Sequence, residues 1–256
     1  MCGAIGRVFD NPFVESLLKT LNIDFHLINE YDIRPTMTVP IAIMSNEQVT
    51  GVQASWWLFQ SATANGYTYN KNYKSFNTRQ EKLLTNRKQD FQTQRCIIPA
   101  SCFYEWNNHR YKIEPLDTAI AFGGLYKTWP ITQATPKQLD LLSDMANNEV
   151  SFSHQTSLFN ESANKNSNEK TSALHYSCSI ITLPSIAEFS HIHAKSFPLM
   201  LTEDEITPWL DSSFSDINYW QSTLTPKIRF DLKVTPVDRK RPEVAIGEST
   251  IIKATH

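Results

Sequence analysis

Residues 95–106 read Arg95-Cys96-Ile97-Ile98-Pro99-Ala100-Ser101-Cys102-Phe103-Tyr104-Glu105-Trp106 and form the most strand-like block of the chain. It is apolar and contains β-branched and aromatic residues of the kind found in strands. Residues 107–109, Asn-Asn-His, follow it as a turn, and residues 110–113, Arg-Tyr-Lys-Ile, lead back. Two such runs on either side of a short polar turn predict a β-hairpin.

Glu105 is the unusual residue of this hairpin. Because side chains alternate along a strand, Phe103 and Glu105 share one face, and Tyr104 and Trp106 share the other. A buried carboxylate is costly to desolvate, so burial would raise the pKa of Glu105 into the range used for proton transfer. The alternative is a glutamate on a solvated strand face, and the sequence leaves both interpretations open.

Upstream of the hairpin, the sequence predicts a mixture of short helices and strands. Asn11-Pro12 begins an amphipathic helix, because Asn is a good N-cap and Pro fits the first turn. Strands are expected over 41–44 and 49–59, followed by a loop over 60–76. Thr78-x-x-Glu81 has the form of a capping box and predicts a helix that runs to about Phe91.

Downstream, strands are expected over 119–126, 176–182 and 230–237, with a short helix or turn over 184–190. Thr202-x-x-Glu205 predicts the start of another helix. Residues 132–175 are polar, and the part at about 150–174 is expected to be a mobile insertion. Hairpins and short helices without a βα repeat predict an α+β fold with a largely antiparallel sheet.

Composition narrows the class of protein. The chain has 256 residues, of which 41% are apolar and 20% charged, as in soluble globular proteins. It lacks an apolar run of membrane-spanning length and a secretory signal, so we expect a cytoplasmic protein, associated with the nucleoid when it binds DNA. Residues 71–112 hold nine basic and three acidic side chains although the whole chain has a net charge of −2. This window suits a groove that follows a phosphate backbone, or else it is a solvated helix face.

Four cysteines occur, and none forms a C-x-x-C pair, so neither a zinc site nor a disulfide framework is indicated. Cys96 and Cys102 lie in strand-like sequence and are expected in the core. Cys2 directly follows Met1, and removal of Met1 would give it a free α-amine beside its thiol. An aldehyde could form an imine with that amine, and the thiol could then close a thiazolidine ring. The plainer alternative is a small residue that happens to follow Met1.

Several stretches together resemble the SOS-response-associated peptidase family, whose members crosslink covalently to abasic sites in single-stranded DNA. The stretches are Met1-Cys2-Gly3, Pro35 to Pro40, Trp56, Asn77-Thr78-Arg79, Arg95 to Trp106, Phe122 to Trp129, Ile180-Ile181-Thr182, Ile192-His193 and Pro198 to Leu201. The resemblance implies one compact α+β domain over residues 1–256, with a barrel-like β core and peripheral helices. It also implies autopeptidase activity, a hydrolase reaction that removes Met1, and lyase-like Schiff-base chemistry.

The resemblance assigns four catalytic positions. Cys2 would be the nucleophile, and Asn77 would position its amine. Glu105 would move protons during Met1 release and imine formation, and His193 would assist opening of the sugar ring. His191 is the alternative histidine, because the segment from His193 to Pro198 is one residue longer than the family's pattern. Ile192 favours His193, and a structural role for either histidine stays open.

The resemblance also assigns contacts to DNA. Arg79 and Arg87 would hold phosphates, Pro40 and Trp56 would shape the groove, and Thr182, Lys195 and Arg7 complete the set. The chain departs from the family's pattern at Ala4, where the family has Arg, and at Cys102, where it has Gly. Ser55-Trp56-Trp57 replaces Arg-Trp-Gly.

Three classes of function follow from these observations. The leading one is a monomeric sensor of abasic sites in single-stranded DNA that needs no metal or other cofactor and has no membrane partner. The second is an N-terminal-nucleophile glutamine amidotransferase, since Met-Cys-Gly opens those enzymes too. The chain has Asn65-Gly66 but no Gly-Asp pair of the kind those enzymes use. The third is a noncovalent single-strand binding module with an inert Cys2.

Overall fold

The computed structural model describes residues 3–8, 11–24, 28–64, 66–131, 174–214 and 216–255. Cys2 and residues 150–173 of the predicted insertion lie outside the described residues.

Five strands close into a barrel. They are β3 (Thr38–Ser45), β4 (Gln48–Ser55), β8 (Arg95–Ala100), β11 (Ile120–Pro130) and β12 (Leu174–Leu183). The order is β12-β4-β3-β8-β11, and β11 pairs with β12 again to complete the ring. Each pairing is antiparallel except that of β12 with β4. The predicted α+β fold with a largely antiparallel, barrel-like core is therefore confirmed.

Three short strands extend the barrel wall. The strand β7 (Asn77–Arg79) runs parallel to β12 beyond the end of β4, which places Asn77 opposite Ile180. The strands β13 (Phe197–Pro198) and β14 (Met200–Leu201) pair with β12 and β11. The wall near the end of β12 is thus built from segments far apart in the sequence.

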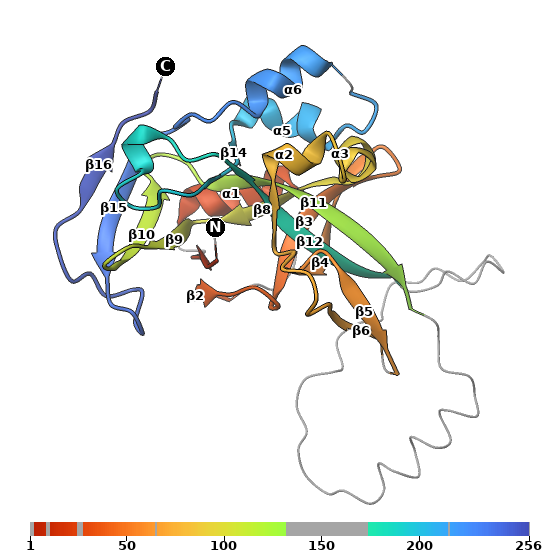
Figure 1. Ribbon diagram of the computed structural model, residues 1–256, viewed down its shortest axis with the longest axis horizontal. Helices are drawn as coiled ribbons and strands as arrows, with labels where there is room; N and C mark the ends of the chain where they lie inside the picture. The colour runs from red at the N-terminus through yellow and green to blue at the C-terminus, as the bar shows by residue number, and fades with distance from the viewer. Residues whose placement is uncertain are drawn as a thin grey trace, which may run out of the picture.

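A second antiparallel sheet has the order β16-β15-β10-β9-β1-β2 and lies at the left in Figure 1. Its strands are β1 (Ile5–Arg7), β2 (Glu30–Ile33), β9 (Cys102–Trp106), β10 (Arg110–Pro115), β15 (Leu232–Val237) and β16 (Thr250–Ile252). The predicted hairpin is β9–β10, and the first half of its block is β8 of the barrel. The break falls at Ser101, whose backbone and side chain both donate hydrogen bonds to the Gly6 carbonyl, at 2.9 and 3.0 Å.

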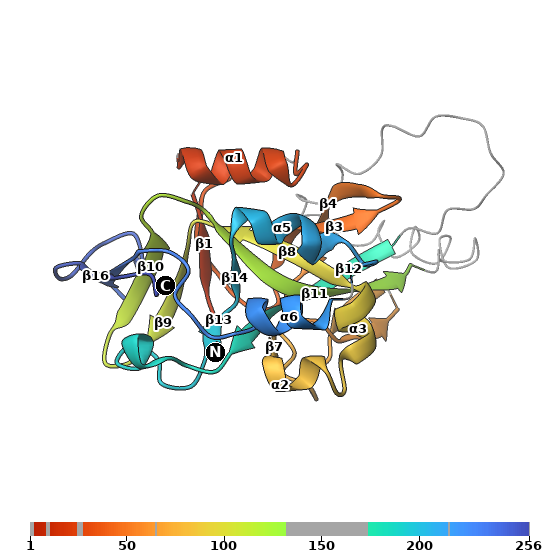
Figure 2. The same cartoon turned by 90° about the horizontal axis from the view of Figure 1, so that it is seen from above.

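Short helices cover the outside of the barrel. They are α1 (Pro12–Thr20), α2 (Gln80–Leu83), α3 (Lys88–Thr93), α5 (Glu203–Leu210) and α6 (Ile217–Thr223). The 3-10 turn η1 (Ala187–Phe189) lies instead against β9, where the Phe189 ring contacts that of Phe103. Figure 2 shows α1 and α2 on opposite sides of the molecule. Two predicted starts are confirmed: Asn11 Oδ1 accepts a hydrogen bond from Phe13 N, and Glu205 Oε2 accepts one from Thr202 N.

Two predictions about residues 49–76 were wrong. The strand from residue 49 ends at Ser55, before the two tryptophans, and the predicted loop contains the hairpin of β5 (Gln60–Thr63) and β6 (Gly66–Tyr69). Aromatic packing stabilises this hairpin, because the centre of the Tyr69 ring lies 5.2 Å from that of Trp57. In strands this short and polar, the alternation of apolar and polar residues that identifies a strand is not visible in the sequence.

The predicted helix from Thr78 to Phe91 was also wrong. Thr78 belongs to β7, and its hydroxyl contacts Ser179 Oγ at 2.8 Å, so it does not cap a helix. The helix begins only after Arg79 and is interrupted between α2 and α3. Thr85 and Asn86, both weak helix formers, lie at the interruption.

Two apolar clusters lie on the two sides of the barrel wall. Alternate residues such as Ile41, Ile98 and Ile180 face the interior, and this cluster continues into the second sheet through Phe103. Their neighbours face outward and pack against the helices, for example against Trp209. Cys96 and Cys102 are buried, as predicted.

Close packing inside the barrel predicts that Gly124→Ala destabilises the protein. A Cβ at Gly124 would lie 2.3 Å from Ile98 Cδ1 and 2.7 Å from the Ser179 carbonyl, so the wall must shift. We expect urea denaturation to show a loss of about 1–3 kcal/mol, as for other overpacked cores. Gly247→Ala is the control, since its Cβ meets Pro236 at an ordinary 3.4 Å, and an equal loss in both variants would contradict the packing argument.

Candidate functional site

The site lies where β9 meets the loop that follows η1. Phe103 contributes to the interior cluster, while Tyr104 packs with Ala4 and Val237 on the other face of β9. The predicted alternation along this strand is therefore confirmed. Glu105 shares the face of Phe103, and only 1% of its surface is exposed. The carboxyl group is thus buried at the end of the strand and is not on a solvated face.

His193 is the neighbour of that carboxyl group. Its Nδ1 lies 3.3 Å from Glu105 Oε2, and the ring is half-buried. The loop that carries it is held at three points: His193 N donates to the Phe189 carbonyl, Ser185 Oγ donates to the His193 carbonyl, and Asn107 Nδ2 donates to the His191 carbonyl. His191 itself is exposed. The structure therefore places His193, and not His191, beside Glu105.

Burial sets the protonation of this pair. It raises the pKa of Glu105 from its ordinary value of 4.5 to about 8 and lowers the pKa of His193 to about 4. Hydrogen bonds with the Trp106 backbone act in the opposite direction on both groups. At pH 7 both are consequently neutral. A neutral carboxyl group that can donate a proton then lies beside a neutral imidazole that can accept one.

Two further strands, β7 and β1, position Asn77 and the start of the chain. Asn77 is half-buried at the first position of β7. The β1–β9 register sets Ile5 opposite Phe103, and Tyr104 N donates to the Ala4 carbonyl at 3.0 Å. Continued by two residues, this register sets Gly3 opposite Glu105. Cys2 lies outside the described residues, and only its covalent bond to Gly3 ties it to this end of β9.

A family model decides the assignment of the chain. The model of the SOS response associated peptidase (SRAP) family matches residues 1–243, which is nearly the whole sequence. The chain belongs to the SRAP family. Membership confirms the resemblance seen in the sequence.

Curated relatives of this SRAP chain carry related names. It is 26% identical over 175 residues to the "Abasic site processing protein YobE" of Bacillus subtilis (strain 168). It is 27% identical over 177 residues to the "Abasic site processing protein YoqW" of the same strain. These alignments cover 64% of this chain and 62% and 60% of the two relatives, so the chain spans under two thirds of their lengths.

Two solved structures share the SRAP chain's fold. A protein from Bacteroides thetaiotaomicron superposes with a TM-score of 0.57 over 91% of both chains, at 17% identity. A phage-related protein from Bordetella bronchiseptica gives a TM-score of 0.53 at 14% identity, covering 93% of this chain and 95% of that one. At these identities the likeness is one of fold.

The predicted DNA contacts of the SRAP chain fall into an exposed group and a buried group. Arg79 has 59% of its side chain exposed and lies 3.7 Å from Glu81, and Lys195 is also exposed. Arg87 is more enclosed, because its guanidinium lies 4.3 Å from the centre of the Phe59 ring. The exposed cations could meet a phosphate without rearrangement.

The remaining predicted contacts are buried. Pro40 and Thr182 lie within strands of the barrel, and Trp56 donates its indole N–H to the Phe76 carbonyl at 2.8 Å. Arg7 forms an ion pair with Glu30, and burial lowers the pKa of its guanidinium. These four side chains are thus buried in the described structure and do not lie on a solvent-facing surface.

Neither a metal centre nor a membrane segment is found in the described part of the chain. No group of three or more His, Cys, Asp or Glu side chains there is arranged to hold a metal ion. None of the helices in the same residues has the length and apolarity that a bilayer crossing requires.

The sequence did not point to Asn107 or Ser185, whose hydrogen bonds hold the loop of His193. Asn107 was visible only as a turn residue. Its bond to the His191 carbonyl joins segments 84 positions apart, and no short sequence motif records such a contact.

Proposed function

We propose that this SRAP chain captures abasic sites in single-stranded DNA as a covalent adduct of Cys2, after Met1 has been removed. The observation that carries the proposal is the buried Glu105 carboxyl group 3.3 Å from His193, at the strand end to which Gly3 leads. Family membership and the names of the two Bacillus relatives support it. The exposed cations Arg79 and Lys195 supply affinity for a phosphate backbone.

The chemistry begins with hydrolysis of the Met1–Cys2 peptide bond, which releases the α-amine of Cys2. An abasic sugar opens to an aldehyde, and the amine adds to its carbonyl carbon to give a carbinolamine. Loss of water yields an imine. The thiol sulfur then adds to the imine carbon, and its proton passes to nitrogen, which closes a thiazolidine ring. No external oxidant or reductant is needed.

Glu105 and His193 provide the proton transfers of this sequence. The neutral carboxyl group of Glu105 protonates the departing hydroxyl of the carbinolamine. The neutral imidazole of His193 accepts a proton from the sugar oxygen during ring opening. It can then return a proton to Glu105 across 3.3 Å. Asn77 orients the amine through a hydrogen bond to its side-chain amide. A buried site suits these steps because water competes poorly there.

Intact-mass measurement tests the proposal. The purified protein is expected to lack Met1, and incubation with an abasic oligonucleotide should add the mass of the DNA less one water. An unchanged mass after incubation would contradict the proposal. Glutaminase activity in the same preparation, with no DNA adduct, would favour the amidotransferase alternative.

The rate of adduct formation is expected to be bell-shaped in pH. It should rise as the Cys2 amine, with an ordinary pKa of about 7.7–8.0, loses its proton. It should fall as Glu105 ionises through its raised pKa of about 8. A crosslinking time course between pH 6 and 10, on protein that already lacks Met1, measures both limbs.

Glu105→Gln is the control for that profile, because the amide has no proton to lose and the falling limb should disappear. A wild-type rate that stays constant up to pH 10 would contradict an acid role for Glu105.

A further inference from the structure

Tyr73 is an exposed aromatic residue on a loop whose hydrogen bonds do not involve its side chain. It lies between β6 and β7, with 60% of its surface exposed. Hydrogen bonds from Asn70 N to the Phe59 carbonyl, from Leu58 N to the Ser75 carbonyl and from Phe59 N to Ser75 Oγ hold the loop. The ring is therefore presented to solvent on a fixed backbone.

The ring contact of Tyr73 leads to a pair of cations. Its ring meets the edge of the Phe59 ring, with the ring centres 5.8 Å apart. The Arg87 guanidinium lies 4.3 Å from the centre of the same Phe59 ring, and Lys127 Nζ lies 6.0 Å from it. Two aromatic rings and two cations thus form one cluster, named here the Tyr73 cluster.

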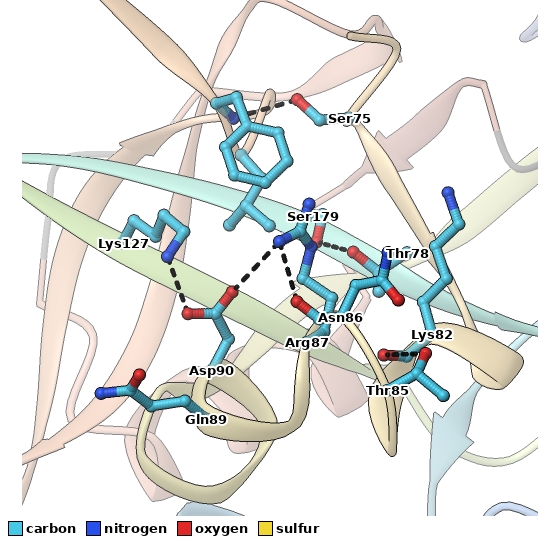
Figure 3. Close-up of polar contacts among 12 residues, drawn as sticks. Ser75, Thr78, Lys82, Thr85, Asn86, Arg87, Gln89, Asp90, Lys127 and Ser179 are labelled. Carbon is cyan, nitrogen blue, oxygen red and sulfur yellow. Dashed lines mark hydrogen bonds and ion pairs between the residues drawn. The ribbon is translucent and has the colours of Figure 1, made fainter.

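Asp90 holds the two cations of this cluster in place. Its Oδ1 accepts a hydrogen bond from Lys127 Nζ at 2.7 Å, and its Oδ2 lies 4.0 Å from Arg87 Nη1, as Figure 3 shows. One carboxylate between two cations leaves a net charge of +1. The cluster therefore keeps a positive charge to offer a phosphate.

The charge around the cluster also favours a polyanion. Residues 71–87 contain five basic side chains and one acidic one, a net charge of +4 in a chain whose total is −2. Single-stranded nucleic acids bind to surfaces that combine aromatic rings for stacking with cations along the backbone. A lipid surface or an acidic peptide would use the cations, but neither has a planar base to cover an exposed ring.

We propose that the Tyr73 cluster binds a nucleotide that flanks the abasic site, with its base stacked on Tyr73 and its phosphate held by Arg87 and Lys127. This inference rests on the proposed function, because it takes the strand to run past Asn77. Tyr73 and Asn77 are four positions apart, so their Cα atoms lie within about 14 Å. At roughly 3.4 Å per nucleotide in a stacked strand, that distance is at most about four nucleotides.

Equilibrium binding tests the stacking contact without the covalent step. The probe is a fluorescent single strand with a tetrahydrofuran abasic analogue, which has no aldehyde. Anisotropy should show that Tyr73→Ala weakens binding roughly 5- to 150-fold, the range expected for loss of one stacked base. Tyr73→Phe should bind within about twofold of wild type, because stacking uses the ring and not the hydroxyl. Tyr31→Ala is the matched control, since Tyr31 is 39% exposed on β2 of the second sheet.

Removing single bases from the DNA identifies the stacked position. One flanking nucleotide at a time is replaced by a second tetrahydrofuran unit, which removes its base. At one position this replacement should weaken binding by the wild-type protein and leave binding by the Tyr73→Ala protein unchanged. The phosphate contacts are tested separately: Arg87→Gln and Lys127→Gln should each reduce the slope of log K against log salt by about 0.7.

The outcomes separate this site from the proposed function. Equal DNA affinity of wild type and Tyr73→Ala would overturn the site. A loss of affinity that is the same whichever base is removed would also overturn it. Suppose that the effect of removing one base depends on Tyr73, but that wild-type protein gives no adduct with a true abasic strand. That result would support the nucleotide site and contradict covalent capture. Adduct formation by a protein whose DNA affinity does not depend on Tyr73 would support covalent capture and contradict the nucleotide site.

Discussion

A Cys2→Ala protein is expected to form no denaturant-stable adduct with abasic single-stranded DNA. Only an N-terminal cysteine offers both an amine and a thiol to one aldehyde carbon. The other three cysteines cannot replace it, because Cys96, Cys102 and Cys178 are buried and burial raises the pKa of each thiol. The measurement is a denaturing gel after incubation with the abasic strand, with the same protein assayed for noncovalent binding.

Cys2→Ser is the informative companion of that variant. It keeps the α-amine once Met1 is removed, but its hydroxyl is a much weaker nucleophile than a thiol. We therefore expect an imine that borohydride traps and that heat reverses when borohydride is left out. A heat-stable adduct of either variant without reduction would exclude the thiazolidine. An adduct of the wild type that heat reverses would show that the chemistry stops at the imine.

The sequence predicted the parts of this fold in which a local pattern and the tertiary structure agree. The alternation of residues 103–106 placed Phe103 and Glu105 on one face because strand geometry allows no other arrangement. The cap at Asn11 and the box at Thr202 were also found, since both stabilise a helix through contacts only two or three residues away. Such features need no knowledge of the rest of the chain.

The errors arose where a distant segment changed the local preference. Thr78-x-x-Glu81 has the form of a helix start, yet β12 pairs with Thr78 and places Ser179 Oγ beside its hydroxyl. Pairing with β12, and a hydroxyl contact between residues 101 positions apart, outweighed the capping signal. The same holds for β5 and β6, whose short polar strands are stabilised by Trp57 and Trp129, which lie outside the hairpin.

The site shows the same division. Glu105 stood out because a carboxylate in an apolar strand is rare, whereas its distance from His193 depends on a loop far along the chain. The histidine pair could not be resolved from spacing, because His191 and His193 fit the pattern almost equally well. The fold separates them through the Asn107 and Ser185 hydrogen bonds, which leave His191 exposed and bring His193 to the carboxyl group.

Glu105→Gln is expected to slow adduct formation by about 10²–10⁴, the usual worth of one general acid or base. The amide has the shape of the protonated carboxyl group, and it can keep the contact with His193 and the hydrogen bond with the Trp106 backbone. It cannot deliver a proton to a departing hydroxyl. The variant should also retain Met1, since peptide hydrolysis needs the same transfers. The measurements are mass spectrometry for Met1 and a crosslinking time course after an added aminopeptidase has removed it.

A control variant and a stability measurement exclude a merely structural effect. Glu114→Gln on β10 removes a strand glutamate that pairs with Lys112 on the surface of the second sheet, and it should leave the rate unchanged. Between pH 4.5 and about 8 the unfolded chain has lost the Glu105 proton while the folded protein keeps it, so wild-type stability falls as pH rises. Glu105→Gln removes that dependence, and it should therefore gain stability relative to wild type across this window.

These two readouts together decide the role of Glu105. A slow variant that also loses stability at every pH would mean that the substitution has disturbed the strand, and the rate could not be assigned to proton transfer. A slow variant with the expected gain in stability toward pH 8 has an intact fold and lacks only the proton. Wild-type rates in that same folded variant would leave His193 as the group that must supply it, because among the described residues it is the titratable side chain in contact with Glu105.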